Sequence, residues 1–354
     1  MQAAMKAARA RWQVVLLPAA IALASVLAAC TAGSSGTITS SAQAPQPGSL
    51  SPTASAAASG APATCQAAPA PNPPDPAGWP APGTAVKATV YPEIVSSEQV
   101  CGANRLLFSF LDASNKPVAS PDRTASVAFF NLGRDALAPA ATAKGTFLWA
   151  IPDERGLYVA SVDFTEAGEW GAEFTTAVAG GTPEKIRLRF EVRPTGSSIP
   201  VGGKAPADRT PTATDVGGDL ARISSDQHPD PAFYKVSVDQ AIAARKPFAL
   251  IFATPLFCTS GVCGPTLDNL KAVAAQRPGF TFINVEPYKL DYANGQLQPV
   301  LDANGQLQPV QATLDYGLLS EPWIFVIDGS GTVRGSFEAV ASPAELTAAI
   351  DAVK

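Results

Sequence analysis

Two cysteines in the stretch FATPLFCTSGVCGPTLDNL are the residues of this chain best suited to chemistry. Cys258 and Cys263 lie five positions apart, between an apolar run and a segment with helical spacing. Such a pair can form a disulfide when the two Cα atoms come within about 7 Å. A pair of this kind can exchange disulfides with another protein, bind a soft metal ion through its thiolates when reduced, or form a purely structural disulfide. The redox compartment decides among these roles, because disulfides persist mainly outside the cytoplasm.

The first thirty residues predict export. Three basic residues precede a mostly apolar segment over residues 12–29, in the order found in secretory signal peptides. The motif LAAC, Leu27–Cys30, resembles the bacterial lipobox, where the chain is cleaved before a cysteine that carries lipid. We therefore expect a signal peptide over residues 1–29, a lipidated Cys30 and a location on the extracytoplasmic face of the cell membrane. An ordinary cleaved signal or an uncleaved anchor would also place the remaining chain outside the cytoplasm.

The next segment, residues 30–84, predicts a flexible tether that follows the lipidated cysteine. It is rich in Ala, Pro, Ser and Thr, with almost no charge, and buries too little apolar surface to fold. The net charge of −5 and the lack of a basic run argue against nucleic acid as a partner. Four cysteines remain besides Cys30, an even number that favours two disulfides. By elimination, Cys65 pairs with Cys101 and ties the end of the tether to the first domain.

Residues 85–193 show the period-two pattern of strands, and about seven short strands predict an all-β immunoglobulin-like sandwich. In the segment 184–193, apolar residues alternate with charged ones. Segments 156–164 and 168–176, joined by TEAG, are expected to form a hairpin. Trp149 and Trp170 are interpreted as core aromatics, and no set of residues in this domain suggests catalysis.

A Pro/Gly/Thr-rich linker over residues 194–218 precedes an expected α/β domain over 219–354. Its signals follow the order helix, strand, helix, strand, loop, strand, strand, helix. The run FALIFAT, residues 248–254, predicts a strand buried on both faces. The loop holds the repeat ANGQLQPV at 293–300 and 303–310, which we interpret as a duplication tolerated at the surface. A functional binding loop remains the alternative.

This order of elements, with a cysteine pair between a buried strand and a helix, resembles the thioredoxin superfamily over roughly residues 230–354. The segment SEPWIFVIDGSG places Pro322 just before a strand, where the family has its cis-proline. Together with IFATPLFCTSGVCGP, it is similar to a group of bacterial exported thioredoxin-like lipoproteins. The resemblance implies a thioredoxin-like domain behind the sandwich and a thiol–disulfide oxidoreductase that acts on exported proteins.

The resemblance also implies a role for each site residue. Cys258 would be the catalytic nucleophile, stabilised as a thiolate by the N–H groups of the following helix, and Cys263 the resolving thiol. Pro322 would bind substrate backbone, flanked by Glu321 and Trp323. No cofactor is implied, and the redox partner is unknown.

Three features of the sequence depart from the family pattern. The cysteine spacing is C-x4-C rather than C-x-x-C, Phe257 replaces the usual tryptophan, and FALIFAT lacks the usual buried acid. Proton transfer would therefore need water or another group. Two alternatives stay open: a non-catalytic binding lipoprotein with a structural disulfide, and a copper carrier that recruits the single histidine, His228. Because no histidine follows Cys263, we expect no metal site.

Overall fold

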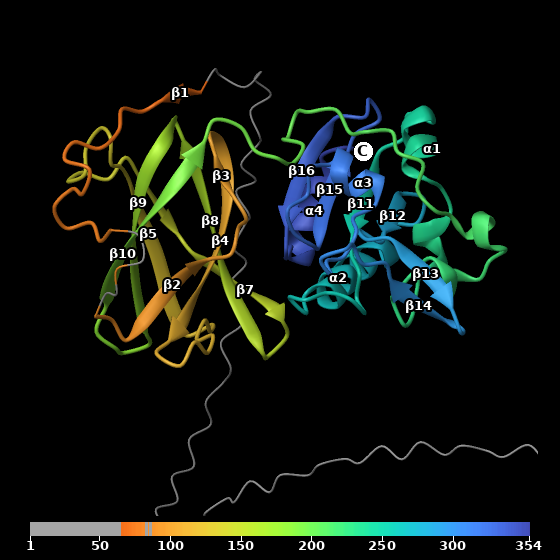
Figure 1. Ribbon diagram of the computed structural model, residues 1–354, viewed down its shortest axis with the longest axis horizontal. Coiled ribbons are helices and arrows are strands. Elements are labelled where there is room, and N and C mark those ends of the chain that lie inside the picture. The colour runs from red at the N-terminus through yellow and green to blue at the C-terminus, as the bar shows by residue number, and fades with distance from the viewer. Residues whose placement is uncertain (1–64, 82–83, 85–86) are drawn as a thin grey trace, which may run out of the picture. The chain divides into compact units, whose positions relative to one another are not determined.

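The computed structural model describes residues 65–81, 84 and 87–354 (Figure 1). The predicted signal peptide, Cys30 and most of the predicted tether lie outside the described residues. Among the helices that are described, none has the length and apolar character needed to cross a membrane.

The N-terminal half is a β-sandwich, as predicted. Its first sheet has the order β3-β10-β9-β5-β6, with β1 added parallel to β9. These strands are β1 (Gln66–Ala67), β3 (Gln99–Val100), β5 (Arg123–Asn131), β6 (Ala141–Lys144), β9 (Glu166–Val178) and β10 (Glu184–Arg193). The second sheet, in the order β2-β4-β8-β7, is antiparallel throughout. It contains β2 (Val90–Ile94), β4 (Gly102–Asp112), β7 (Thr146–Ile151) and β8 (Arg155–Phe164).

Alternating side chains of both sheets meet in an aromatic core. Phe108 of β4 packs 5.1 Å from Phe174 of β9, measured between ring centroids, which joins the two sheets. Trp170 is 1% exposed and belongs to this core, whereas Trp149 is half-buried against Phe147. The predicted hairpin between 156–164 and 168–176 is wrong, because β8 and β9 belong to different sheets. The short link between them carries the chain from one sheet to the other.

The last part of the predicted tether is folded onto the sandwich. Trp79 is 4% exposed, and its indole N–H donates to the carbonyl of Ala136 over 2.8 Å. Its ring lies against Gly171, where an added Cβ would come within 2.3 Å of the indole. The guanidinium of Arg187 stacks over the same ring. The Ala/Pro-rich composition gives no sign that this segment packs on the sandwich. It does so because the single buried tryptophan supplies the apolar area that its neighbours lack.

Cys65 and Cys101 form a disulfide with a Cα–Cα distance of 6.1 Å. The bond joins the residue before β1 to the residue between β3 and β4. Together with Trp79, it fixes both ends of the segment 65–81 to the sandwich.

The C-terminal half is built on a four-stranded mixed sheet in the order β12-β11-β15-β16. Its strands are β11 (Phe248–Phe252), β12 (Thr281–Val285), β15 (Trp323–Ile327) and β16 (Val333–Glu338). Helices α2 (Cys263–Ala275) and α4 (Pro343–Asp351) pack on the sheet face that carries Ala249 and Ile251. Helices α1 (Val238–Ala243) and α3 (Gln311–Asp315) pack on the face that carries Phe248 and Leu250.

The expectation of an α/β class for this part of the chain is wrong. Strands make up 38% of the structure and helices only 15%, so the protein is mostly β. The helical periodicity in the sequence translates into short helices, with six residues in α1 and five in α3. Short 3-10 helices also occur at η1 (Ala213–Val216), η2 (Leu220–Arg222) and η3 (Pro231–Tyr234).

The predicted linker and the repeat loop both have ordered backbone. The linker residues Gly202 and Ala205 donate N–H groups to Val333 and Gly331 beside β16. The first repeat copy closes the hairpin of β13 (Leu290–Ala293) and β14 (Gln296–Pro299) through an Asn-Gly turn. Both turn residues have positive φ, which Asn-Gly pairs tolerate at low cost.

Candidate functional site

The structure joins Cys258 and Cys263 in a disulfide with a Cα–Cα distance of 6.0 Å. Cys258 lies in the loop after β11, and Cys263 is the first residue of α2. All five residues of β11 are buried, so the strand delivers the loop from the middle of the sheet. The predicted position of the pair, between a buried strand and a helix, is confirmed.

The two sulfur-bearing residues differ in exposure. Cys258 is half-buried, while Cys263 is 0% exposed and packs with Leu267 and Leu270 of its own helix. The backbone N–H of Cys263 donates to Cys258 Sγ over 3.3 Å, and Ser260 Oγ lies 3.2 Å from the same sulfur. Both groups can donate to a thiolate at Cys258, which would favour the charged form.

Pro322 follows a cis peptide bond at Glu321–Pro322, immediately before β15. Its carbonyl accepts a hydrogen bond from the N–H of Ala339 over 2.8 Å, and the residue is buried. Ala339 in turn accepts from Thr266 Oγ1 of α2 over 2.9 Å. This chain of contacts links the segment that carries Pro322 to the helix that carries Cys263.

Glu321 is the acidic residue that the structure brings close to both cysteine sulfurs. One carboxylate oxygen of Glu321 and the sulfurs of Cys258 and Cys263 all lie within 4.8 Å of one another. Tyr288, in the segment after β12, donates its hydroxyl hydrogen to Glu321 Oε2. Burial raises the pKa of the Glu321 carboxyl, and the hydrogen bond from Tyr288 opposes that shift. Burial and the neighbouring Glu321 also raise the pKa of Tyr288, which keeps it a donor at neutral pH.

The structure does not support the expected substrate contact by Trp323. This side chain is 6% exposed, stacks on Phe325 and donates its indole N–H to Ser336 Oγ over 2.9 Å. As the first residue of β15, it points into the layer between the sheet and the short helices. Trp323 is therefore a core residue rather than part of an accessible rim.

The β-sandwich contacts the loop that closes the disulfide ring. Arg155 of β8 donates to the carbonyl of Ser260 over 2.7 Å. Val262, the residue before Cys263, is 5% exposed and packs with Ala150 and Leu157. Sequence reasoning missed these contacts because nothing in the period-two pattern shows which strand ends reach another domain.

Two acidic residues lie near the carboxyl ends of strands β12 and β16, and the sequence alone does not predict their surroundings. Glu286 follows β12 and accepts from the backbone N–H of Ser225 over 2.6 Å. Its Oε2 atom is buried and has no hydrogen-bond partner among the described residues. Burial raises the pKa of Glu286 to about 7. Glu338, at the end of β16, is instead bound by Ser97 and Ser320.

The fold does not bring the histidine that a copper carrier would need to the cysteine pair. His228 is exposed, and its backbone N–H donates to Asp226 Oδ1 over 3.1 Å. It lies outside the group formed by the two sulfurs and Glu321.

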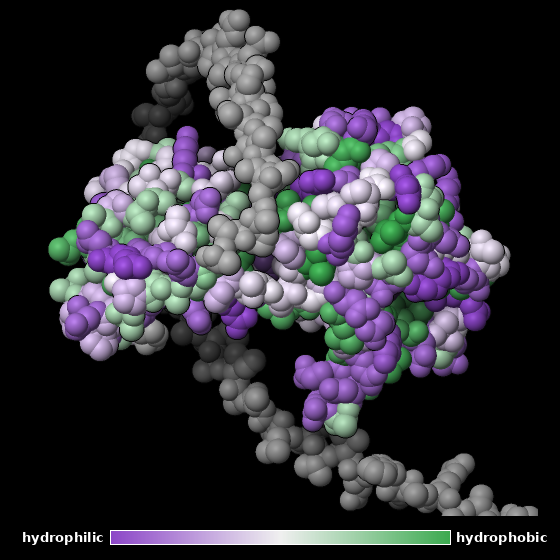
Figure 2. All heavy atoms as spheres, turned by 90° about the horizontal axis from the view of Figure 1, so that it is seen from above, coloured by the Kyte–Doolittle hydropathy of each residue, from purple (hydrophilic) through white to green (hydrophobic). Residues whose placement is uncertain are grey.

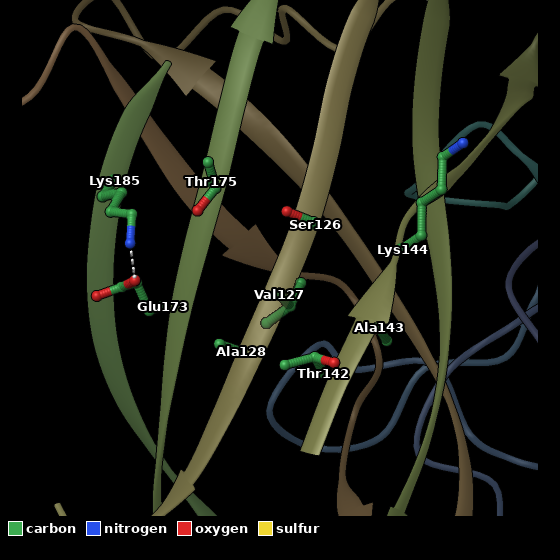
Figure 3. Close-up of a pocket in the computed structure, with 9 residues that line it drawn as sticks. All are labelled: Ser126, Val127, Ala128, Thr142, Ala143, Lys144, Glu173, Thr175 and Lys185. Carbon is green, nitrogen blue, oxygen red and sulfur yellow. Dashed lines mark hydrogen bonds and ion pairs between the residues drawn. The ribbon is translucent and has the colours of Figure 1, made fainter. Parts of the chain in front are cut away.

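A separate hollow of about 360 Å³ lies on the sandwich rather than at the cysteine pair (Figure 3). Its walls come from β5, β6, β9 and β10, and an ion pair between Lys185 and Glu173 crosses one side. On the face shown in Figure 2, hydrophobic and hydrophilic residues are mixed in small groups. Two exposed leucines lie close in sequence to the cysteine site. Leu256 and Leu319 are each 58% exposed, and they lie two positions before Cys258 and Glu321, respectively.

Comparison with known proteins identifies no family for this chain. No family model matches it, and no curated protein matches it. Among solved structures, the crystal structure of the Lin-41 filamin domain matches 29% of this chain and 93% of its own chain. The identity is 17% and the TM-score is 0.18, a likeness too weak to carry an argument.

Proposed function

We propose that this protein is an extracytoplasmic thiol–disulfide oxidoreductase that acts on exported proteins through Cys258 and Cys263. The observation that carries the proposal is the asymmetry of the pair. Cys258 is half-buried in the loop before α2, whereas Cys263, the first residue of α2, is fully buried. A disulfide with one accessible and one protected sulfur can be attacked only from one side, which defines a nucleophile and a resolving thiol.

In the reduced form, the Cys258 thiolate attacks a substrate disulfide. A bond forms between Cys258 and one substrate sulfur, the substrate S–S bond breaks, and the second substrate sulfur leaves as a thiolate. Cys263 then loses its proton and attacks Cys258, which closes the intramolecular disulfide and releases the first substrate sulfur. Two electrons pass from the protein to the substrate, and every step reverses when the substrate is a dithiol.

The surroundings of the pair favour a polypeptide substrate. Leu256 and Leu319 expose apolar surface close in sequence to Cys258 and to the cis peptide bond before Pro322. Exposed apolar side chains beside a reactive group can hold an unfolded segment without demanding a particular sequence. The predicted signal peptide and lipidated Cys30 would keep this site at the membrane surface, where newly exported proteins emerge.

A trapping experiment tests the proposal. Reduced Cys263→Ser should accumulate a mixed disulfide with an unfolded test protein that carries one activated disulfide, because the resolving thiol is missing. Cys258→Ser should accumulate none, because Cys263 is buried. Replacement of Cys65 and Cys101 together by Ser removes only the other disulfide and leaves no unpaired thiol, so it serves as the matched control and should neither create nor abolish trapping. Equal trapping by Cys258→Ser and Cys263→Ser would contradict the assignment.

A non-catalytic binding lipoprotein is the second candidate. The observation in its favour is the contact between the cysteine loop and the sandwich, through Arg155 and Val262, which fastens the ring. In that case the disulfide would resist reduction, and no variant would trap a partner. The relationship to exported thioredoxin-like lipoproteins remains a prediction.

A further inference from the structure

We propose that Glu321 is the proton carrier of thiol–disulfide exchange, delivering a proton to the buried sulfur of Cys263 and taking it back. The inference rests on the proposed function and fills the place of the acid that the strand before the cysteines lacks. It changes the expected role of Glu321 from substrate contact to catalytic residue.

Geometry is the first argument. A Glu321 carboxylate oxygen lies within 4.8 Å of both sulfurs, close enough for proton transfer after a small movement or through one water molecule. Cys263 is 0% exposed, so bulk solvent cannot serve as the proton source for its sulfur. The N–H of Ala339 holds the carbonyl of Pro322, the residue after Glu321, over 2.8 Å.

The charge environment is the second argument. The titratable groups that face the carboxyl are Tyr288 from the segment after β12 and the two cysteines. Glu338 of β16 is bound to Ser97 and Ser320 instead. No basic residue is hydrogen-bonded or ion-paired to Glu321 among the described residues, so burial keeps its proton affinity high. Tyr288 donates to one carboxylate oxygen, Oε2, and so holds the side chain in place.

Glu321 gives up a proton when the Cys258–Cys263 disulfide is reduced and takes one up when the disulfide forms. When a substrate thiolate attacks Cys258, the bond between Cys258 and Cys263 breaks and Cys263 leaves with the electron pair. The protonated carboxyl of Glu321 gives its proton to the Cys263 sulfur and becomes a carboxylate. In the reverse direction, the Glu321 carboxylate takes the proton from the Cys263 thiol, which then attacks Cys258. The departing substrate sulfur takes up a proton from Glu321 or from water.

The reaction of the reduced protein with an aromatic disulfide tests the proposal, because each step of the exchange releases one coloured aromatic thiolate. The second release reports the attack of Cys263 separately from the attack of Cys258. The reduced protein should release one equivalent quickly, when Cys258 attacks, and the second when Cys263 attacks. Glu321→Gln should slow the second release about 100-fold, at the lower end of general acid–base effects, and should affect the first release much less. Glu338→Gln is the matched control, since Ser97 and Ser320 bind this carboxyl, and it should leave both releases unchanged.

The pH profile separates catalysis from a structural role. In the wild type, the second release should rise with the ionisation of Glu321, and Glu321→Gln should lose that inflection. Tyr288→Phe should keep the inflection but move it to higher pH, because the hydrogen bond that stabilises the carboxylate is gone. An unchanged rate and profile in Glu321→Gln, or an equal loss in Glu286→Gln, would overturn the assignment. Failure of the first release in the wild type would instead refute the proposed function.

Discussion

Glu286→Gln provides a quantitative test of the electrostatics at the carboxyl ends of the strands. The Glu286 carboxyl accepts from Ser225, and its other oxygen is buried without a partner among the described residues. Burial raises its pKa from 4.5 to about 7. A group whose pKa is raised by folding contributes stability that is complete below the unfolded pKa and is lost as the pH rises through the folded pKa.

The size of the effect follows from that shift. With about 1.4 kcal/mol for each pKa unit, the shift corresponds to at most about 3–4 kcal/mol, of which about 2–3 kcal/mol falls between pH 5 and pH 8. Glutamine keeps an acceptor for the Ser225 N–H and cannot ionise. The free energy of unfolding of the wild type should therefore fall relative to that of Glu286→Gln by about 2–3 kcal/mol between these pH values.

Urea unfolding of both proteins with intact disulfides, at several pH values, measures this difference directly. Other groups that titrate in the same range cancel in the comparison, including Asp208, whose pKa burial and the neighbouring Asp315 raise to about 6. Parallel pH profiles for the two proteins would refute the reasoning and show that the Glu286 carboxylate is solvated.

Three further changes test other parts of the structure. Trp79→Ala should lower the free energy of unfolding of the described unit by about 3–5 kcal/mol in urea titration, because the buried ring leaves a cavity; a loss below 1 kcal/mol would show that this segment is not anchored. Arg105→Ala breaks an ion pair with Glu345. Burial alone would raise the pKa of Glu345, but Arg105 and the helix cap lower it, so this variant's deficit should shrink as the pH falls below about 4; a deficit independent of pH would contradict the ion pair. Replacing Cys65 and Cys101 together by Ser should cost about 3–4 kcal/mol through the longer unfolded loop, measured under non-reducing conditions, and unchanged stability would contradict it.

The sequence predicted the local features of this fold better than its long-range ones. Alternation in 184–193 and the buried run 248–254 produced the strands β10 and β11, because both patterns report burial directly. The link between β8 and β9 was misread as a hairpin, since a short polar connection looks the same whether the chain stays in one sheet or changes sheets. The anchor Trp79 was hidden by the prolines around it.

At the candidate site, the sequence predicted the disulfide, and the resemblance to the thioredoxin superfamily implied the cis bond before Pro322. It could not predict that Trp323 would turn into the core or that Tyr288 would hold Glu321. Tyr288 and Glu321 are separated by 33 positions, and only the packing of the segment after β12 against the start of β15 brings them together. Helix content was overestimated because helical periodicity does not fix helix length.

The reduction potential of the Cys258–Cys263 disulfide tests the central claim most directly. Equilibration of the protein in thiol–disulfide buffers, followed by differential alkylation and peptide mass spectrometry, separates this bond from Cys65–Cys101. The proposal predicts that Cys258–Cys263 becomes half-reduced at a potential less negative than about −300 mV, while Cys65–Cys101 stays oxidised there. A potential below about −300 mV for Cys258–Cys263 would mark a structural bond and contradict the proposed exchange.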